Sequence, residues 1–355
     1  MNTIDVFAGA YAINKIKAEG FSAQMFDTFL GASGGPKWFI LAGLDRVIFP
    51  ELFSQIDTSI NIVGSSAGAF RAACLTQKDP IAAINRLADK YSNTVYSAKP
   101  TVAEITEKGY DLLEYVMGAT GVHEVLNHPK HIAHFSVAQC HGAVESENKF
   151  KQMSGLLKAG ARNAISRKRL AKSFTRALFS AKHNTLSFID PDQFPTNNYL
   201  LTQDNLIPAL MASGSIPLVL EGVANIPGAK PGMYRDGGII DYHFDLRFNT
   251  DKLVLYPHFY STPTPGWFDK NLKRPCTHSS YENVVLISPS KAFVETLPYK
   301  KIPDRKDFEK MEASQRIDYW SKVISESDRM GEELINKIND GSIVQHIKPI
   351  QLNRK

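Results

Sequence analysis

Cysteine is scarce in this sequence: its 355 residues include three, Cys74, Cys140 and Cys276, with no Cys-x-x-Cys pair. An odd number without paired spacing argues against a disulfide framework or structural zinc site and fits a reducing compartment. Long apolar runs are also lacking, since none approaches the roughly 18 to 20 residues of a membrane span. Charged residues interrupt the first segment where a signal peptide needs an apolar core. The sequence predicts a cytoplasmic protein, leaving open peripheral membrane contact and export without an N-terminal signal.

A strong overall charge is lacking too, because 41 basic residues face 36 acidic ones and the net charge is only +5. The hydrophobic fraction of 43% is that of an ordinary globular protein and excludes wholesale disorder. The positive charge is local: residues 149–182 hold ten basic residues and no acidic one. With Leu170, Phe174 and Leu178 spaced by four, this stretch predicts a helix with one apolar stripe.

The basic stretch 149–182 has two interpretations. Its apolar stripe packs on the core beneath a solvated basic face, or the helix docks on an anionic membrane surface. Nucleic-acid binding is not predicted, because aromatic residues are not interleaved with the basic ones.

Short apolar runs alternate with helical patterns along the rest of the chain. Strands are expected at residues 25–30, 59–63, 132–138, 253–256 and 284–287, and helices at residues 8–19, 36–47, 67–75 and 304–339. This alternation predicts a layered α/β fold with a largely parallel sheet.

The sharpest chemical signal is a Gly-x-Ser-x-Gly motif at residues 64–68. An apolar run precedes it and a small-residue helical pattern follows it, which is the setting of a nucleophile elbow. Such a turn strains the backbone of its serine and requires glycine at its flanks. The helix that follows places backbone N–H groups where an oxyanion would form. Ser66 is therefore the predicted nucleophile, and the competing interpretation is an ordinary serine in a glycine turn.

A second Gly-x-Ser-x-Gly match at residues 31–35 makes Ser33 a rival nucleophile. This segment also lies between a strand-like run and a helix. It half resembles a phosphate-binding loop, but the residues that follow do not match that motif. Its last glycines, Gly34 and Gly35, have another use, because they can offer unobstructed N–H groups to an oxyanion on Ser66.

A serine hydroxyl needs a base, and the best carboxylate is Asp236, which opens an Asp-Gly-Gly motif. Its glycines let the aspartate approach another backbone closely, although Asp-Gly is also an ordinary turn sequence. Asp190, Asp241 and Asp245 compete with it.

These motifs, in this order, resemble those of the patatin-like phospholipases. In that family a glycine-rich loop with a basic residue comes first, then the elbow, then an Asp-Gly-Gly or Asp-Gly-Ala motif. Residues 34–37, 64–68 and 236–238 match these three in turn. The segment Ala-Ser-Gly-Ser-Ile-Pro at residues 212–217 is similar to the family's small-residue segment before the aspartate strand. The resemblance covers about residues 26–245.

The resemblance implies a three-layer α/β/α patatin-like fold with a mostly parallel central sheet. It places an acyl hydrolase core at residues 1–290, with a basic helical insertion at about 149–182. Residues 291–355 would form a helical C-terminal extension packed on that core.

The resemblance further implies a Ser–Asp dyad that hydrolyses lipid acyl esters, as phospholipase A and lysophospholipases do, without cofactor or metal. Ser66 would attack the ester carbonyl and Asp236 would act as base. The N–H groups of Gly34, Gly35 and Ala67 would form the oxyanion hole. The supporting motif residues would be Lys37, Gly64, Gly68, Gly237 and Gly238. The expected partner is a lipid substrate, and no protein partner is indicated.

The sequence departs from the family pattern at Ser33, at Trp38 and at residues 241–243, where Asp-Tyr-His replaces an Asn-containing continuation. Two other functions stay open. One is a soluble carboxylesterase or thioesterase with a Ser–Asp–His triad completed by a histidine. The other is an inert lipid-binding protein of the same fold. The triad candidates are His243, His258 and His278. The clustered His128, His131, His134 and His141 are interpreted as ordinary surface or core residues, because residues three apart on a strand face opposite sides.

Overall fold

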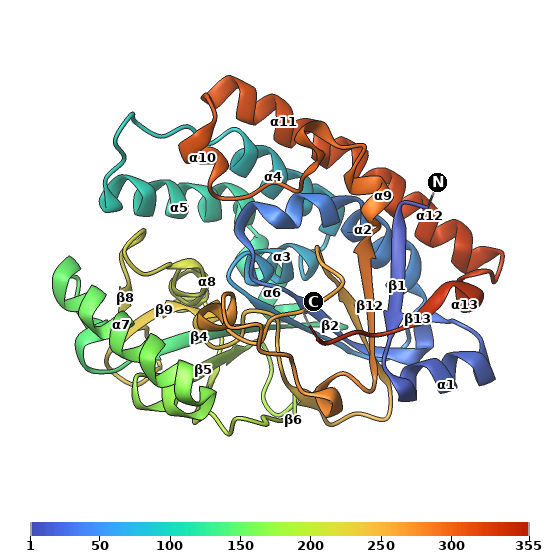
Figure 1. Ribbon diagram of the computed structural model, residues 1–355, viewed down its shortest axis with the longest axis horizontal. Coiled ribbons are helices and arrows are strands. Elements are labelled where there is room, and N and C mark those ends of the chain that lie inside the picture. Colours follow the sequence, from blue (N-terminus) through green and yellow to red (C-terminus); the bar gives the residue numbers. More distant parts are fainter. Residues whose placement is uncertain (1, 354–355) are drawn as a thin grey trace.

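The computed structural model describes residues 2–353, and its apolar runs form one large mixed sheet with two edge strands attached beside β4 (Figure 1). The strand order is β13-β1-β12-β11-β2-β3-β4-β5-β7, with β9 pairing β4 and β8 pairing β9. The strands of this sheet are β1 (Ile4–Ala8), β2 (Phe26–Gly31), β3 (Ile60–Ser65), β4 (His131–Cys140), β5 (Phe174–Ser180), β7 (Thr196–Leu200), β8 (Val223–Ala224), β9 (Met233–Asp236), β11 (Leu253–Pro257), β12 (Val284–Pro289) and β13 (Ile347–Pro349). A separate pair joins β6 (Phe188–Ile189) and β10 (Arg247–Phe248).

The middle of the sheet is parallel, as predicted. Strands β12, β11, β2, β3 and β4 lie side by side and all run in one direction. These are the five strands expected from the sequence, and their near-continuous apolar character is typical of parallel strands covered on both faces. Because parallel strands end at the same edge, the segments that follow β2 and β3 meet there.

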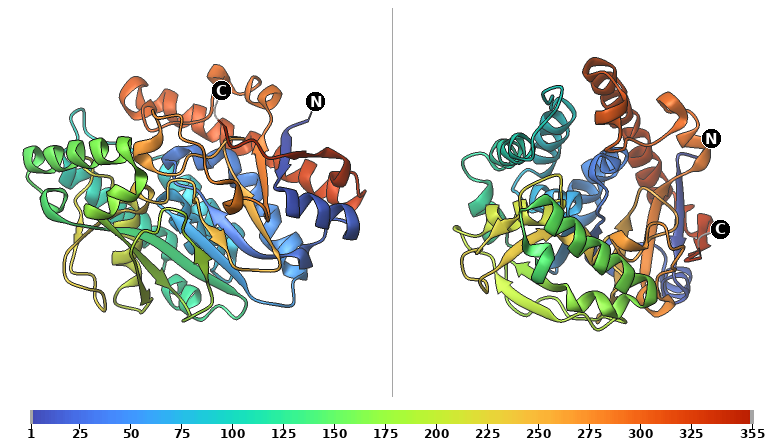
Figure 2. Two further views of the ribbon diagram at one scale, coloured as in Figure 1. Left: turned by 60° about the horizontal axis from the view of Figure 1, so that its bottom comes forward. Right: turned by 60° about the vertical axis from the view of Figure 1, so that its left-hand side comes forward.

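Helices flank the sheet and complete the α/β/α fold; α2, α4, α5 and α11 lie together above it in Figure 1, and Figure 2 shows the same layers from two further sides. The helices are α1 (Ala10–Glu19), α2 (Ala42–Val47), α3 (Ala67–Leu75), α4 (Pro80–Ser92), α5 (Val102–Met117), α6 (Gly121–Asn127), α7 (Lys149–Ile165), α8 (Leu206–Gly214), α9 (Lys291–Val294), α10 (Asp307–Lys310), α11 (Ala313–Glu326), α12 (Asp328–Asn339) and α13 (Ile343–His346). None of the helices within residues 2–353 combines the length and apolar composition needed to cross a bilayer.

The basic stretch 149–182 is only partly helical, so the predicted continuous helix is wrong. Helix α7 occupies its first half, but Phe174 and Leu178 belong to β5, which pairs antiparallel with β4. Residues four apart share a face in a strand as well as in a helix, so the spacing alone did not distinguish the two. Within β5, Arg176 is buried in the sheet and forms ion pairs with Asp241 and Asp190.

The C-terminal part of the chain packs on both the helices and the sheet. Its last strand, β13, pairs parallel with β1 at the sheet edge. Helix α12 packs on α2, where the N–H of Gly43 donates to the Ser327 hydroxyl at 2.9 Å and Arg46 forms an ion pair with Asp328. The helical character expected after residue 304 is confirmed, and the division of the chain at residue 290 stays a prediction.

Candidate active site

The elbow at residues 64–68 joins β3 to α3 through a strained serine. Ser66 has φ 55° and ψ −127°, a conformation that L residues rarely adopt. A Cβ atom on Gly64 would overlap the carbonyl oxygen of Gly68, and one on Gly68 would overlap that of Gly31. Glycine is therefore required on both sides of Ser66, because the two neighbouring turns touch through their backbones.

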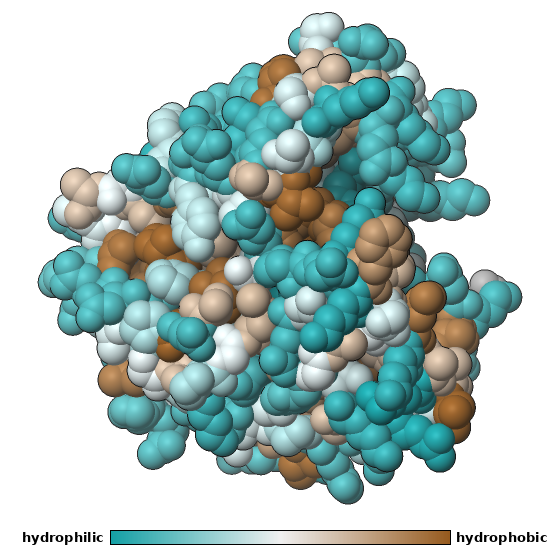
Figure 3. Space-filling view, turned by 90° about the vertical axis from the view of Figure 1, so that its left-hand side faces the viewer, coloured by the Kyte–Doolittle hydropathy of each residue, from teal (hydrophilic) through white to brown (hydrophobic). Residues whose placement is uncertain are grey.

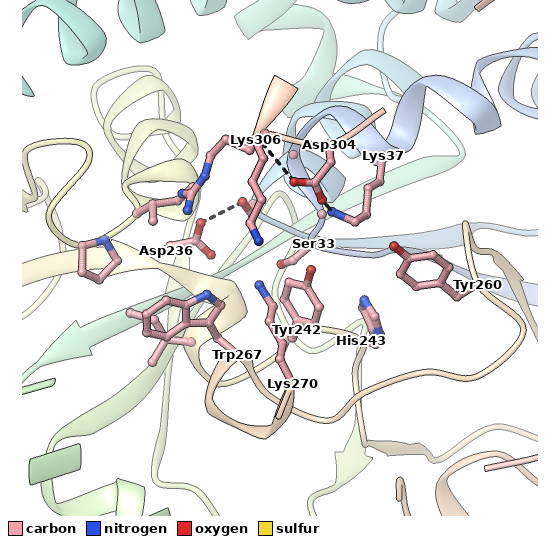
Figure 4. Close-up of a pocket in the computed structure, with 17 residues that line it drawn as sticks. Ser33, Lys37, Asp236, Tyr242, His243, Tyr260, Trp267, Lys270, Asp304 and Lys306 are labelled. Atoms are coloured by element: carbon pink, nitrogen blue, oxygen red, sulfur yellow. Dashed lines mark hydrogen bonds and ion pairs between the residues drawn. The ribbon is translucent and has the colours of Figure 1, made fainter. Parts of the chain in front are cut away.

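The hydroxyl of Ser66 meets the predicted carboxylate. Its Oγ donates to Oδ2 of Asp236 at 2.8 Å, although the two residues are 170 positions apart. Asp236 ends β9, its N–H donates to the carbonyl of Ser215 at 3.0 Å, and its Oδ1 accepts from the Gly238 N–H at 2.7 Å. Exposure is 6% for Ser66 and 8% for Asp236. Figure 4 shows the Asp236 carboxylate in this contact, at the edge of a cavity.

The two glycines after Asp236 permit this approach. A Cβ atom on Gly237 would overlap the Ser136 carbonyl oxygen on β4, and one on Gly238 would crowd the Ser33 hydroxyl. The Asp-Gly-Gly motif is thus a place where three segments of backbone come together, rather than an isolated turn.

Burial changes the acidity of Asp236. Desolvation raises the pKa of its carboxyl to about 6, while the hydrogen bonds from Ser66 and Gly238 and the charges of Lys270 and Arg305 act in the opposite direction. A carboxylate with a pKa near neutrality can accept the proton of a hydroxyl that attacks a carbonyl and then return it to a leaving group.

The competing carboxylates are engaged elsewhere. Asp241 receives two hydrogen bonds from Arg176, at 2.7 and 2.8 Å, and one from the Ser136 hydroxyl at 2.6 Å. Asp190 forms an ion pair with the same guanidinium, and Asp245 accepts from Thr277. Of the four aspartates considered, the hydrogen bond to Ser66 belongs to Asp236.

The rival serine, Ser33, points to a different partner. Its hydroxyl donates to Oγ of Ser65 at 2.9 Å and lies 3.1 Å from the Ser65 carbonyl oxygen. Its own N–H donates to the Tyr242 carbonyl at 3.0 Å. Ser33 therefore links the two glycine turns.

Of the three histidines proposed for a triad, His243 lies in the cavity wall. His243 accepts at Nδ1 from the Thr264 N–H at 2.7 Å, and its ring stacks on that of Tyr242. In a triad the imidazole lies between serine and carboxylate, but here Asp236 contacts Ser66 directly. The geometry therefore favours a dyad over the triad.

Two of the three predicted oxyanion donors line the cavity, and the third follows Ser66 directly in the chain. Gly34 precedes a 3₁₀ turn over Gly35–Leu41, Gly35 has φ 55°, and both residues line the cavity with Ser66. Ala67 is the first residue of α3. The N–H groups of a first helical turn have no partner within their helix, which leaves them able to bind a developing negative charge.

One positioning residue was not identified from the sequence. The N–H of Ser66 donates to the Ser213 hydroxyl at 2.9 Å, and that hydroxyl donates to the Ser136 carbonyl at 2.8 Å. Ser213 thereby ties the elbow to α8 and β4. Its only signal in the sequence was its place in the small-residue segment 212–217.

Ser66 and Asp236 open on a cavity of about 310 Å³. Lys37, predicted only as a motif residue, lines it and forms an ion pair with Asp304. The wall also includes residues from two segments that carried no motif: Trp267 and Lys270 from one, and residues 304–306 from the other. Within residues 2–353, no group of three or more histidine, cysteine or carboxylate side chains is arranged to hold a metal ion.

Comparison with known proteins supports the family that the motifs resemble. A family model described as patatin-like phospholipase matches residues 60–243, about half of the chain. No curated protein matches the chain. Among solved structures, the crystal structure of VipD from Legionella pneumophila is similar over 72% of this chain and 53% of that chain, at 14% sequence identity and a TM-score of 0.33. The chain thus spans about half the length of that structure.

Proposed function

Because the chain belongs to the patatin-like phospholipase family, we propose that it hydrolyses lipid acyl esters through a Ser66–Asp236 dyad, as a phospholipase A or lysophospholipase. The observation that carries the proposal is the 2.8 Å hydrogen bond from the Ser66 hydroxyl to the buried Asp236 carboxylate. Membership of the family is the basis for proposing lipid acyl esters as substrates. The hydrogen bond between Ser66 and Asp236 is the basis for proposing a serine nucleophile with a carboxylate base.

In the first half-reaction, Ser66 Oγ attacks the ester carbonyl carbon while its proton passes to Asp236. The carbonyl oxygen becomes negative, and the N–H groups of Gly34, Gly35 and Ala67 stabilise it. Collapse of the tetrahedral intermediate breaks the bond to the alcohol, which takes the proton from Asp236 as it leaves. An acyl-enzyme remains on Ser66.

In the second half-reaction, water takes the place of the alcohol. Asp236 accepts a proton from the water as it attacks the acyl-enzyme, and the same oxyanion donors stabilise the new intermediate. Its collapse returns the proton to Ser66 and releases a fatty acid. The strained backbone of Ser66 keeps its Oγ facing the carboxylate through both steps.

Covalent labelling tests the nucleophile. A fluorophosphonate probe should modify the wild-type protein, with the adduct on Ser66 by peptide mass spectrometry, and should leave Ser66→Ala unlabelled. Fatty acid release from a mixed lipid extract should be lost in Ser66→Ala and in Asp236→Asn, each with an unchanged circular dichroism spectrum. Full activity of either variant would refute the dyad. An unlabelled, inactive wild type would instead favour an inert lipid-binding protein.

We also propose that helix α7 contacts an anionic membrane surface. Phe150 and Leu157 are about two helical turns apart on its outer side, and their side chains are 85% and 68% exposed. Lys149, Lys151 and Lys158 are exposed on the same helix. Apolar side chains beside lysines suit the interface of a bilayer with anionic lipids. Figure 3 views the side on which α7 lies, where hydrophobic patches interrupt the hydrophilic surface.

Vesicle co-sedimentation tests this contact. The protein should bind vesicles of phosphatidylglycerol and phosphatidylcholine more strongly than vesicles of phosphatidylcholine alone. Phe150→Ser with Leu157→Ser should weaken that binding, whereas Tyr11→Ser, on α1 at the other side of the molecule in Figure 1, should not. Equal binding by all three proteins would refute a role for α7.

A further inference from the structure

The cavity beside Ser66 has a wall of positive charge that the dyad chemistry does not use. Four cationic side chains line it, against two carboxylates. They are Lys37, Lys270, Arg305 and Lys306. One of the two carboxylates is Asp236 and the other, Asp304, forms an ion pair with Lys37. The lining therefore carries net positive charge next to the proposed nucleophile, which favours an anionic group there.

These cations come from parts of the chain outside the family match at residues 60–243. Lys270 follows the 3₁₀ turn Trp267–Asp269, and its ammonium lies 4.1 Å from the centre of the Tyr242 ring. In Figure 4 the amino groups of Lys270 and Lys306 both point into the cavity, on the side where Asp236 lies. The positive charge of the cavity therefore comes from residues outside the part of the chain that matches the family model.

The segment that carries Arg305 and Lys306 is held in place. The buried carboxylate of Asp307 accepts from the Asp304 N–H at 2.8 Å and from the Trp320 indole N–H at 3.1 Å, and it forms an ion pair with Lys301. The turn at residues 304–307 is therefore anchored to α11 through the contact between Asp307 and Trp320. Arg305 and Lys306 themselves are exposed at the cavity rim, and among residues 2–353 neither side chain has a carboxylate within 4.0 Å.

The electrostatics of the cavity agree with this crowding. Burial lowers the pKa of Lys270 to about 8. The charges of Lys37 and Arg305 act in the same direction, and those of Asp236 and Asp304 oppose them. An anion bound among these groups would relieve their mutual repulsion. The rest of the lining is largely apolar and includes Ile216, Pro217 and Trp267, which suits an acyl chain.

We propose that Lys270, Arg305 and Lys306 bind the anionic phosphate of the substrate, so that the protein selects acyl esters of anionic phospholipids over neutral or zwitterionic ones. This inference rests on the proposed function for the reaction, but it concerns recognition. The rim cations act on substrate binding, and the dyad acts on the ester bond. A zwitterionic headgroup is disfavoured because its ammonium would approach the same cations.

The first test measures binding without turnover. Ser66→Ala is titrated by calorimetry with monomeric short-chain phosphatidylglycerol, with the matched phosphatidylcholine, and with inorganic phosphate alone. Both lipids carry the phosphate, but only phosphatidylcholine adds an ammonium that the rim cations repel, which predicts about tenfold tighter binding of phosphatidylglycerol. Arg305→Gln with Lys306→Gln should abolish this preference. Equal affinity for both lipids would refute the proposal, as would phosphate binding as tightly as the anionic lipid, which would indicate a site for free phosphate.

A charge-matched control distinguishes the effect of the cations that line the cavity from the effect of the protein's net charge. Lys300→Gln with Lys310→Gln removes the same charge from exposed positions of the same region that do not line the cavity. It should keep the preference for phosphatidylglycerol. If both double variants lose the preference equally, the effect is long-range charge, and the proposed contact is wrong.

Turnover distinguishes this inference from the proposed function. In the otherwise unmodified protein, Lys306→Gln, which keeps the Arg305 charge that acts on Asp236, should lower kcat/KM for the anionic lipid about fivefold and change that for a neutral diacylglycerol of the same chains less than about twofold. A fall of equal size for both substrates would overturn the recognition role while leaving the dyad intact. Loss of the dyad's role would appear only in the Ser66 and Asp236 variants.

Discussion

Two glycine–serine turns lie side by side in this molecule and have different structures. Both match Gly-x-Ser-x-Gly, both follow a strand of the parallel sheet, and the strands pair in register with Gly31 opposite Gly64. In the turn at residues 64–68, Ser66 has a positive φ and its hydroxyl meets a buried carboxylate. In the turn at residues 31–35, Ser33 is hydrogen-bonded to Ser65.

The difference shows that the motif alone does not make a nucleophile. A serine is activated when its backbone directs Oγ toward a base, and the proposed base, Asp236, is hydrogen-bonded to the serine of the turn at residues 64–68. The other turn contributes its glycines instead, because Gly34 and Gly35 line the cavity at the start of a helical turn. The two turns are therefore complementary in the proposed mechanism.

The largest expected effect separates the two serines. Ser66→Ala should lower kcat at least about 10³-fold, because it removes the attacking atom. Ser33→Ala should keep activity within about tenfold and cost roughly 1 to 2 kcal/mol of stability, because it breaks a buried hydrogen bond. Initial rates of fatty acid release and urea denaturation of both variants measure this. Comparable loss of activity in the two variants, with Ser33→Ala still folded, would mean that the turns are not specialised.

The contact between the turns can be broken at a glycine. Gly68→Ala places a Cβ atom onto the Gly31 carbonyl and should lower the free energy of unfolding by about 2 to 3 kcal/mol. The matched control is Gly160→Ala in α7, where the nearest atom lies 3.5 Å away, on the Phe268 ring. That variant should be neutral or stabilised by up to about 1 kcal/mol. Chemical denaturation measures both, and equal stability would contradict a backbone contact between the turns.

The carboxylate that distinguishes the two turns, Asp236, should lower the free energy of unfolding when it is ionised, because it is buried. Its folded-state pKa of about 6 exceeds its ordinary value of 3.8, so the folded protein holds a proton that the unfolded chain releases. As pH rises from about 4 to about 6, the wild type should therefore lose stability relative to Asp236→Asn, in which this group does not titrate. At neutral pH this variant should be about 1 to 2 kcal/mol more stable than the wild type. Thermal unfolding across this pH range measures the difference; a less stable variant at every pH would argue against the raised pKa.

The smallest expected effect is on the pH profile. Asp236 must be ionised to accept the Ser66 proton. Therefore kcat/KM should fall as the pH is lowered, with an apparent pKa of about 6. One pH unit below that value the loss should be roughly tenfold. A pH–rate profile with a soluble ester measures it, with Ser33→Ala as the control that should keep the same midpoint. A profile that is flat down to about pH 4 would indicate that Asp236 is not the base.

Much of the fold and part of the site were predictable from local patterns. The five parallel strands were found because buried strands are continuous apolar runs, and the elbow was found because a tight turn requires glycine. The structure brings Ser66, Asp236, Gly34 and Gly35 to one cavity, as the order of the motifs predicted. Strand β5 was missed because a spacing of four residues suits a strand face as well as a helix face.

The sequence by itself determined the five parallel strands, the sharp turns at the glycine motifs, and which serines are candidate nucleophiles. Only the tertiary structure decided which aspartate meets Ser66, because Asp190, Asp236, Asp241 and Asp245 are all buried or nearly so and differ in the partner that each one reaches. It also brought Lys270 and residues 304–306 to the cavity. The physical reason is that local patterns act over one turn or strand, whereas contacts across 170 positions depend on strand order and packing.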